Sequence, residues 1–226
     1  MKPPPSILFF GKHGNQYCAA AVEFLKTHFP AHTIFLGRRD EPFPQSAYQW
    51  KGDHIISYLS PWIIAEEVLA NAEISSINFH PGSPEYPGIG CTNFAIYDAV
   101  NSYGVTCHHM DGTVDTGKII MVKRFPVFQT DSVFSVTQRS YCYLLETFYE
   151  VVPALLTHSA LPQSNESWKR KPYRREDLEE LCRIVPGMDL IEMQRRIRSV
   201  TFPNQGGAYI EIDGLRFELG TGNQES

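Results

Sequence analysis

Strand-like and helix-like segments alternate through the first 160 residues, and this alternation restricts the fold more than any other feature of the sequence. Short apolar runs typical of strands occur at 6–11, 33–37, 53–60, 74–80, 103–110 and 117–128. Apolar residues recur at helical spacing in the segments 15–28, 61–72, 91–102 and 132–158. Strands that alternate with helices predict an α/β fold with a Rossmann-like, open and mostly parallel sheet. Ligands of such sheets bind beyond the carboxyl ends of the strands.

Three sites indicate where the predicted helices begin. Asn15 opens the first helical segment and is a good N-cap. Pro61 would occupy the first position of the segment 61–72, where its fixed φ favours a helix. The segment 91–102 would be capped either by Thr92 or by the Gly90–Cys91 turn.

The remaining third of the chain has a different character. Residues 161–177 are polar and contain two prolines, which is typical of a linker or an exposed strap. Two short helices are expected at 175–184 and 189–200, and Asp213–Gly214 between alternating runs predicts a β-hairpin over 208–219. We therefore expect a catalytic domain over 1–160 and a small helix-plus-hairpin appendage over 161–226. An appendage of this size needs the first domain or a partner chain for stability.

Composition and charge limit the partners of the protein. The formal charge of −5 argues against a nucleic-acid-binding protein, although residues 168–177, WKRKPYRRED, are locally basic. Five scattered cysteines without CxxC spacing indicate reduced thiols, each a small core residue, and hence a cytoplasmic protein. We expect no signal peptide at the start of the chain and no membrane span, because no apolar run reaches about 18 residues.

Two cofactor classes fit the polar residues poorly. Residues 11–15, GKHGN, follow the first strand but lack the GxGxxG pattern of dinucleotide-binding folds. His80, His108, His109 and Asp115 would suit a metal, but His108 and His109 are neighbours on a strand and point to opposite faces. We expect no metal, with one of these two histidines buried and hydrogen-bonded and the other partly exposed.

Asn78, His80 and Asp115 form the most informative group. Asn78 and His80 are two apart at a strand end, so their side chains project to one face. Asp115 lies in a loop between the next two predicted strands, at the same edge of the sheet. The amide can stabilise an oxyanion, the imidazole can donate or shuttle a proton, and the carboxylate can orient the imidazole. From spacing alone, an equally good reading is that Asn and Asp serve the backbone at strand ends and turns.

The motifs around these residues resolve the choice by resemblance. NFHPGSPEYPGIG (78–90) followed by VTCHHMDGTVDTGKII (105–120) resembles the signature of the 10-formyltetrahydrofolate-dependent formyltransferases. The Asn-x-His and distant Asp of that family fall on Asn78, His80 and Asp115, which the resemblance makes catalytic. The loop after His80, the segment SYLSPWII (57–64) and the tail are most similar to the nucleotide-sugar N-formyltransferases.

The resemblance implies particular ligands and binding residues. The co-substrate would be 10-formyltetrahydrofolate, bound largely through backbone groups by two segments: Tyr58, Ser60 and Trp62 in one, Met110, Asp111 and Gly112 in the other. The acceptor would be the amine of a dTDP-linked amino-dideoxyhexose of the 4-amino-4,6-dideoxyglucose type, which implies a role in O-antigen or lipopolysaccharide biosynthesis. The residues that we expect to contact this acceptor are Lys12, Phe202 and Tyr209.

Other members of the same family remain alternatives. A methionyl-tRNA formyltransferase would need a larger basic C-terminal domain, and a glycinamide ribonucleotide enzyme usually lacks the hairpin. A formyltetrahydrofolate hydrolase would normally carry a further regulatory domain. A non-catalytic folate- or nucleotide-binding module would not need the intact Asn78, His80 and Asp115. We also expect a homodimer through the C-terminal hairpin, because its strands bury little within so small an appendage.

Overall fold

A six-stranded mixed sheet forms the centre of the molecule in the computed structural model, which describes residues 4–203 and 205–219. Its order is β2-β1-β3-β4-β5-β6. Strands β1 to β4 are parallel to one another, whereas β5 runs antiparallel to both β4 and β6. The predicted α/β sheet is therefore present, with an antiparallel pair at one side. The strands are β1 (Ile7–Lys12), β2 (His32–Gly37), β3 (Gly52–Tyr58), β4 (Ala72–His80), β5 (Ser102–His109) and β6 (Ile119–Pro126).

Helices cover both faces of this sheet and form most of the C-terminal appendage. The first helix is capped as predicted, since Asn15 Oδ1 accepts hydrogen bonds from the backbone N–H groups of Tyr17 and Cys18 at 3.1 and 3.0 Å. The helix expected at 91–102 begins after Gly90, and Thr92 does not cap it. The helices are α1 (Gln16–His28), 3₁₀ helix η1 (Gln45–Gln49), α2 (Glu66–Leu69), α3 (Cys91–Tyr97), α4 (Val133–Leu156), α5 (Arg175–Cys182) and α6 (Leu190–Val200).

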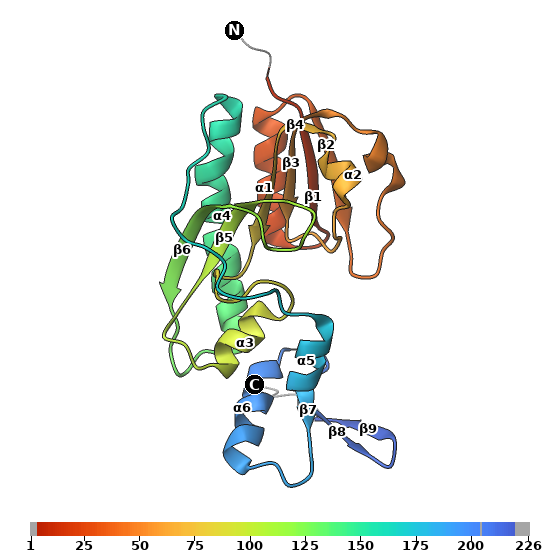
Figure 1. Cartoon of the computed structure of the whole chain (residues 1–226), viewed down its shortest axis with the longest axis vertical. Coiled ribbons are helices and arrows are strands. Elements are labelled where there is room, and N and C mark those ends of the chain that lie inside the picture. The colour runs from red at the N-terminus through yellow and green to blue at the C-terminus, as the bar shows by residue number, and fades with distance from the viewer. Residues whose placement is uncertain (1–3, 204, 220–226) are drawn as a thin grey trace.

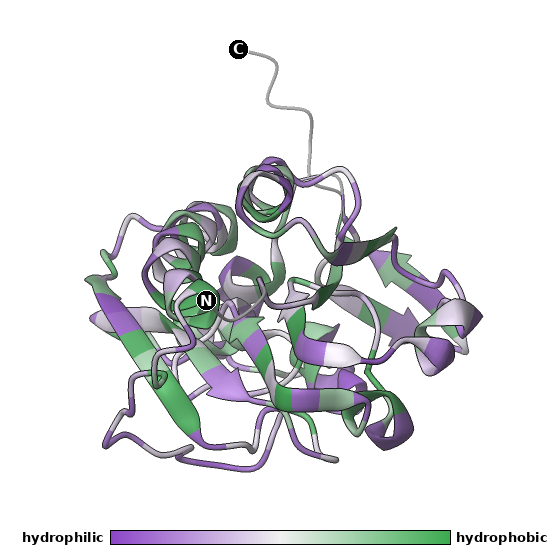
Figure 2. Ribbon diagram, turned by 90° about the horizontal axis from the view of Figure 1, so that it is seen from above, coloured by the Kyte–Doolittle hydropathy of each residue, from purple (hydrophilic) through white to green (hydrophobic). Residues whose placement is uncertain are grey.

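Two apolar layers enclose the strands. On one face α1 and α4 lie side by side (Figure 1), and the Phe148 ring of α4 packs edge-on against Phe9 and Tyr58 of the sheet. On the other face, Phe10 packs against Phe43 together with buried residues of η1 and α2. Figure 2 shows the apolar colouring concentrated on the strands and on the helices beside them. The short, continuously apolar strands are thus buried on both faces, as the sequence pattern predicts.

The segment 61–72 is mostly a loop, so the prediction of a helix beginning at Pro61 is wrong. Leu59 has a φ of 52°, in the left-handed region that a bulky side chain rarely adopts. Ser60 Oγ then accepts a hydrogen bond from the N–H of Trp62 at 3.1 Å. Trp62 packs edge-on against Phe10, and only α2 remains helical. Burial of the indole therefore overrides the local preference for a helix.

The C-terminal appendage packs on the first domain through α6 and α3. Asn93 Nδ2 donates to the Ser199 carbonyl at 2.8 Å, and the Tyr97 hydroxyl donates to Glu192 at 2.9 Å. Helix α5 stops two residues before the predicted end, because Arg183–Ile184 form β7 and pair with β8 (Tyr209–Ile212). The predicted hairpin is present as β8 and β9 (Leu215–Glu218). The domain boundary at 160 remains a prediction, and residues 1–3 and 220–226 lie outside the described residues.

A strap, residues 161–174, connects α4 to α5 and crosses the loop that follows β4 (Figure 1). Its backbone is fastened along its length. The N–H of Ser164 donates to the Ile119 carbonyl at 3.2 Å and the N–H of Lys169 to the Pro84 carbonyl at 3.0 Å. Tyr173 is both donor to Pro87 and acceptor from Ile89. The polar segment that resembles a linker in sequence is thus a fixed part of the first domain's surface.

An Asp–Arg pair stabilises the start of α4. Asp131 accepts hydrogen bonds from both terminal nitrogens of Arg139, at 2.9 and 3.0 Å, and from the N–H of Phe128 at 2.9 Å. These contacts, Arg139 first, lower the pKa of Asp131 to about 2 against the opposing effect of burial.

We expect Asp131→Asn to lower the free energy of unfolding at pH 7 by on the order of 2 kcal/mol. An aspartate whose pKa is lowered by folding stabilises the protein above its unfolded value of about 4. That stabilisation is lost as the pH falls through the folded value. The difference between variant and wild type in urea unfolding should therefore shrink as the pH falls from about 5 to about 2. Asp213→Asn, at an exposed hairpin turn, is the control, and a pH-independent difference would contradict the prediction.

Candidate active site

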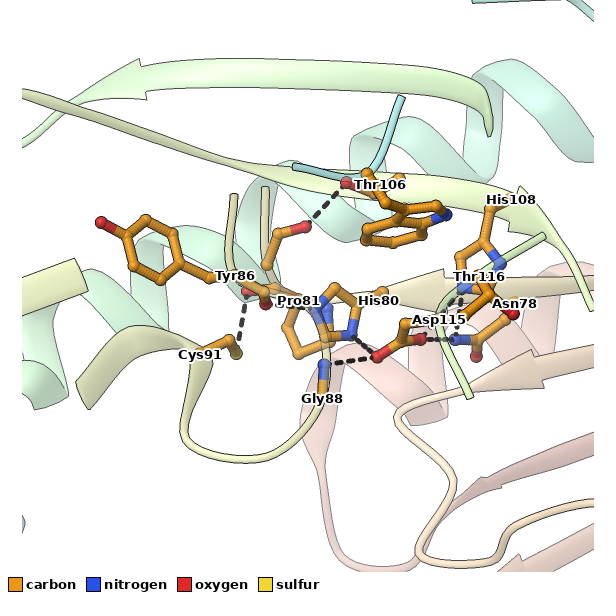
Figure 3. A network of polar contacts seen from close by, with 12 residues as sticks. Asn78, His80, Pro81, Tyr86, Gly88, Cys91, Thr106, His108, Asp115 and Thr116 are labelled. Carbon is orange, nitrogen blue, oxygen red and sulfur yellow. Dashed lines mark hydrogen bonds and ion pairs between the residues drawn. The ribbon is translucent and has the colours of Figure 1, made fainter. Parts of the chain in front are cut away.

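Asn78, His80 and Asp115 converge around the buried carboxylate of Asp115 (Figure 3). His80 Nδ1 lies 3.2 Å from Asp115 Oδ2, and Asn78 Nδ2 lies 3.3 Å from Asp115 Oδ1. Asn78 and His80 come from the last residues of β4 and project to one face, as predicted from their spacing. The structure therefore brings the three predicted catalytic residues together, while their individual roles remain predictions.

The loop that carries Asp115 reaches the site by a different route from the one expected. Because β5 is antiparallel to β4, its last residue His109 pairs with Ile77, and the N–H of Met110 donates to Ser76. The loop 110–118 thus leaves the sheet toward the amino end of β4, not at the carboxyl edge. It then folds back over the sheet. Gly117 makes this possible, since a Cβ there would collide with the His109 carbonyl.

Four nitrogen atoms surround the Asp115 carboxylate. Besides His80 and Asn78, the N–H of Gly88 donates to Oδ2 at 2.8 Å, and His108 Nε2 lies 3.1 Å from Oδ1. Burial alone would raise the pKa of Asp115, but attraction to His80 and the contacts with His108 and Gly88 hold it well below its usual range. Gly88 has a φ of 87° and a Cβ would collide with Tyr173 of the strap, so only glycine fits there. The stiff loop after His80 thereby fixes one donor to the carboxylate.

Each ring nitrogen of His80 has one partner in this arrangement. Nδ1 faces the Asp115 carboxylate, and Nε2 lies 3.0 Å from the carbonyl oxygen of Tyr86. The Tyr86 carbonyl can only accept, so Nε2 is the nitrogen that donates in this arrangement. His80 is only 5% exposed and lies beside the buried Asp115 carboxylate, which can stabilise a positive charge on the ring.

His108 is a site residue that the sequence could not distinguish from its neighbour His109. It is 2% exposed, whereas His109 on the opposite face is partly buried, as predicted for the pair. Its Nδ1 lies 2.7 Å from the His109 carbonyl, and its Nε2 lies 3.1 Å from both Asn78 Nδ2 and Asp115 Oδ1. The pairing of β4 with β5 places His108 directly opposite Asn78. Only that pairing, which no local pattern reveals, selects His108 over His109.

The Asn78 amide is engaged by the protein. With His108 Nε2 unprotonated, the two Asn78 N–H groups have acceptors in His108 and Asp115. With His108 Nε2 protonated, that nitrogen donates to Asp115 and one Asn78 N–H becomes free. Donation from Asn78 to a bound oxyanion therefore requires this release or a rotation of the amide.

Trp168 of the strap forms a wall of the site and was also missed. Its ring packs edge-on against His108 and His80, with centroids 5.0 and 5.9 Å away. Its Nε1 donates to the Gly117 carbonyl at 2.8 Å, which ties the strap to the loop of Asp115. In the sequence Trp168 is separated from His80 by 88 residues, and its basic surroundings indicated a solvated surface. The sequence feature that could have indicated a buried role for Trp168 is its position as a lone tryptophan inside a polar segment.

The predicted binding residues after β3 serve mainly to shape the loop. Tyr58 is fully buried, so only its backbone remains available to a ligand. Ser60 caps the turn at Trp62, and the Trp62 indole donates to the Glu41 carbonyl at 2.9 Å. The exposed apolar side chain of this loop is instead Ile63, at 79%.

The second predicted binding segment lies beside the first. Asp111 Oδ1 accepts hydrogen bonds from the N–H of Thr113 at 3.0 Å and the hydroxyl of Thr116 at 2.7 Å, which fixes the loop's turn. Met110 packs against the apolar cluster beneath the first segment, and Gly112 lies next to Glu66 of α2. The two segments therefore form adjoining walls near Asn78 and Asp115.

The three residues predicted to contact the acceptor are spread over the molecule. Lys12 ends β1 and its Nζ lies 6.0 Å from the centre of the Tyr141 ring. Phe202 packs edge-on against Phe134, and Tyr209 lies beneath the guanidinium of Arg216. Both aromatic rings are thus used in packing, and the acceptor role of all three residues remains a prediction.

Two further findings concern residues 4–203 and 205–219. No group of three or more His, Cys, Asp or Glu side chains there could hold a metal ion. None of the helices in the same part of the chain is both long and apolar enough to cross a membrane. All five cysteines are free, and Cys142 is exposed rather than in the core.

Comparison with known proteins identifies the family and agrees with this fold. A family model described as formyl transferase matches residues 38–151, slightly more than half of the chain, which therefore belongs to this family. The GDP-perosamine N-formyltransferase of Brucella melitensis is 29% identical over 175 residues, which span 77% of this chain and 66% of that enzyme, just under two thirds of its length.

Solved structures match over a larger part of the chain. A 4-N formyltransferase from Francisella tularensis superposes with a TM-score of 0.76 at 18% identity, covering 95% of this chain and 96% of that one. An N-formyltransferase from Helicobacter canadensis, solved with folinic acid and dTDP-3-aminofucose, gives a TM-score of 0.71 at 20% identity, covering 92% and 84%. At these identities, the two matches establish the formyltransferase fold.

Proposed function

We propose that this protein is a sugar N-formyltransferase, which transfers the formyl group of 10-formyltetrahydrofolate to the amine of a nucleotide-linked amino sugar. The observation that carries the proposal is the buried Asp115 carboxylate with His80 and Asn78 on either side, in a chain of the formyl transferase family. The relatives named as sugar N-formyltransferases support the acceptor class.

The charge distribution supports a specific division of roles. 10-Formyltetrahydrofolate supplies the formyl group, and the carbonyl oxygen of this group gains negative charge as the amine attacks its carbon. The bond from that carbon to the folate nitrogen then breaks, so that tetrahydrofolate leaves with a proton on that nitrogen while the amine loses one proton. His80 Nε2–H, which now donates to the Tyr86 carbonyl, is the donor placed to meet that oxygen. Asp115 holds His80 through Nδ1 and stabilises its positive charge. Asn78 adds a second donor when His108 Nε2 donates to Asp115 in its place.

Trp168 shields the rings of His80 and His108 from water. Its ring covers the edges of His80 and His108, and the low polarity of an indole strengthens electrostatic contacts beside it. The strap thus contributes to the environment of the reaction although it lies outside the matched family region.

The folate would lie between the two adjoining loops. The exposed side chains of Ile63 and Val114, at 79% and 42%, belong to these loops and provide apolar surface beside Asn78 and Asp115. The pteridine would then meet apolar side chains and the loop backbones near Tyr58 and Gly112, consistent with a mostly apolar site that has few polar groups.

The proposal also specifies the sugar and the nucleotide base of the acceptor. We favour a dTDP-linked 4-amino-4,6-dideoxyhexose, with Lys12 beside the diphosphate, and the Helicobacter complex with dTDP-3-aminofucose supports a dTDP sugar. The Brucella relative named for GDP-perosamine supports the same class of reaction with a different base. Sugar isomer and base are therefore the variables to test.

The test is a panel of acceptors supplied with 10-formyltetrahydrofolate. We expect turnover with a dTDP-4-amino-4,6-dideoxyhexose, measured by mass spectrometry as the gain of one formyl group. The panel includes dTDP-3-amino sugars, GDP-perosamine, glycinamide ribonucleotide and methionyl-tRNA. Formylation of glycinamide ribonucleotide or methionyl-tRNA, with no nucleotide sugar accepted, would refute the proposal. Preference for GDP-perosamine would change only the nucleotide base that we propose.

We also propose a homodimer through the C-terminal hairpin. Exposed apolar side chains gather there, with Ile212 at 50%, Leu215 at 63%, Phe217 at 52% and Leu219 at 54% exposed. Light scattering should give twice the chain mass, and Phe217→Glu should give a monomer. A monomeric wild-type protein would contradict this part of the proposal. The cytoplasmic location expected from the cysteines remains a prediction.

A further inference from the structure

A cavity lies on the opposite face of the sheet from the catalytic side chains. Its volume is about 370 Å³, and it is formed by the amino ends of β3 and β4, the junction of β5 and β6, the end of α4 and the first residues of the strap. Ser75 at this cavity precedes His80 by five residues, or about 17 Å along an extended strand. The cavity is therefore separate from the proposed formyl-transfer site.

Positively charged and protonatable groups face this cavity from four elements. They are His54, His109, Lys118 and His158. No carboxylate is among the lining residues in the described part of the chain. Lys118 Nζ donates to the neutral amide of Gln163 at 2.9 Å, so its charge is not balanced by that contact. Burial, followed by repulsion from His108 and Lys118, lowers the pKa of His109.

His54 has an unused hydrogen-bonding group at the cavity. The side chain is 2% exposed, and its Nδ1 lies 2.8 Å from the hydroxyl of Ser75. Its Nε2 is buried and has no hydrogen-bond partner among the described residues. When Ser75 donates to Nδ1, the tautomer that follows carries a hydrogen on Nε2 and needs an acceptor. Such buried polar groups are rare without a partner, because an unmade hydrogen bond costs about 1–3 kcal/mol.

The remaining walls are apolar. Ile74, Ile119, Leu155 and Leu161 line the cavity. Its volume far exceeds the roughly 30 Å³ that one water occupies in the liquid. Since Ile74, Lys118 and Gln163 are exposed, the cavity is open to solvent. A ligand that fits must combine an anionic group with an apolar body.

We propose that this cavity binds a small organic anion, a phosphate ester or carboxylate with an apolar body, whose acidic group contacts His54, His109 and Lys118. The anion would accept the hydrogen bond that His54 Nε2 lacks and balance the charge of Lys118. The apolar body would lie against Leu155 and Leu161. This inference stands independently of the acceptor sugar and of catalysis.

Phenyl phosphate is the probe, titrated into the full chain by calorimetry, with benzoate, inorganic phosphate and phenol as comparisons. We expect saturable binding of phenyl phosphate or benzoate, weaker binding of inorganic phosphate, and none of phenol. Lys118→Met should weaken the binding at least about tenfold. In NMR spectra the ring signals of His54 and His109 should shift on titration, with assignment by His109→Gln.

Two matched variants separate this site from the rest of the molecule. Lys171→Met removes an exposed lysine of the strap that does not line the cavity, and it should leave binding unchanged. Asp115→Asn alters the formyl-transfer site and should also leave binding unchanged. Absence of saturable binding by both aromatic anions would overturn the proposal. So would binding that survives Lys118→Met but is lost in Asp115→Asn, because the probe would then occupy the other site.

Discussion

Asp115→Asn is expected to lower kcat/KM for formyl transfer by a factor of about 10² to 10⁴, as loss of the residue that orients a catalytic histidine does elsewhere. The carboxylate lies 3.2 Å from His80 Nδ1 and is the only anion that contacts this side chain within residues 4–203 and 205–219. An amide in its place is neutral and presents both a donor and an acceptor. The imidazolium of His80 then loses its counterion and its fixed orientation.

The measurement must separate this effect from unfolding. Attraction to His80 and the contacts with His108 and Gly88 outweigh burial and leave the pKa of Asp115 below its usual range, so its charge stabilises the folded chain above about pH 4 and this contribution is lost on acidification. The variant will therefore also be less stable at pH 7. Steady-state kinetics should be combined with thermal melts, and assays run well below the variant's midpoint. Asp213→Asn is the control, because it makes the same change at an exposed residue. The backbone of Asp213 is in the left-handed region, with a φ of 50°. A rate within threefold of wild type for Asp115→Asn would remove Asp115 from the mechanism.

His80→Asn is expected to cause a loss of similar size, about 10² to 10⁴ in kcat, with a much smaller change in KM. Asparagine can still donate one hydrogen bond to a developing oxyanion, but it carries no transferable proton and no positive charge. Because the effect arises as charge develops on the formyl oxygen, it should appear in the chemical step and not in substrate binding.

Two comparisons make this second prediction decisive. His28→Asn changes an exposed histidine at the end of α1 and should leave kcat unchanged. Asp115→Asn combined with His80→Asn should cost little more than either change alone, because the two residues act as one unit. Single-turnover measurements would locate the affected step. Independent, multiplicative losses in the double variant would show that the carboxylate and imidazole do not cooperate.

His108 and Trp168 indicate what a motif search leaves out. The family motif covers Asn78, His80 and Asp115, yet the carboxylate is held equally by His108, and the imidazoles are covered by a ring from the strap. Both additional residues depend on contacts between distant parts of the chain. A site defined by its motif alone would therefore lack one of its histidines and its wall.

Local patterns were sufficient wherever a segment decides its own structure. The apolar runs of β1 and β3, the Asn15 cap of α1 and the Asp213–Gly214 turn are set by burial, hydrogen bonding and backbone freedom within a few residues. The spacing of Asn78 and His80 likewise places both side chains on one face of β4. Their link to Asp115 as a catalytic group came from the motif's likeness to a family, since spacing alone left a backbone role open.

Tertiary contacts decided the rest. Burial of Trp62 against Phe10 turned a predicted helix into a loop, and the antiparallel direction of β5 sent the Asp115 loop back over the sheet. The same pairing put His108, and not His109, opposite Asn78. Residue types and periodicity thus determined which segments are strands or helices and which side chains can do chemistry. Which of those side chains meet depends on strand order, strand direction and the path of the strap, because these follow from packing over the whole chain.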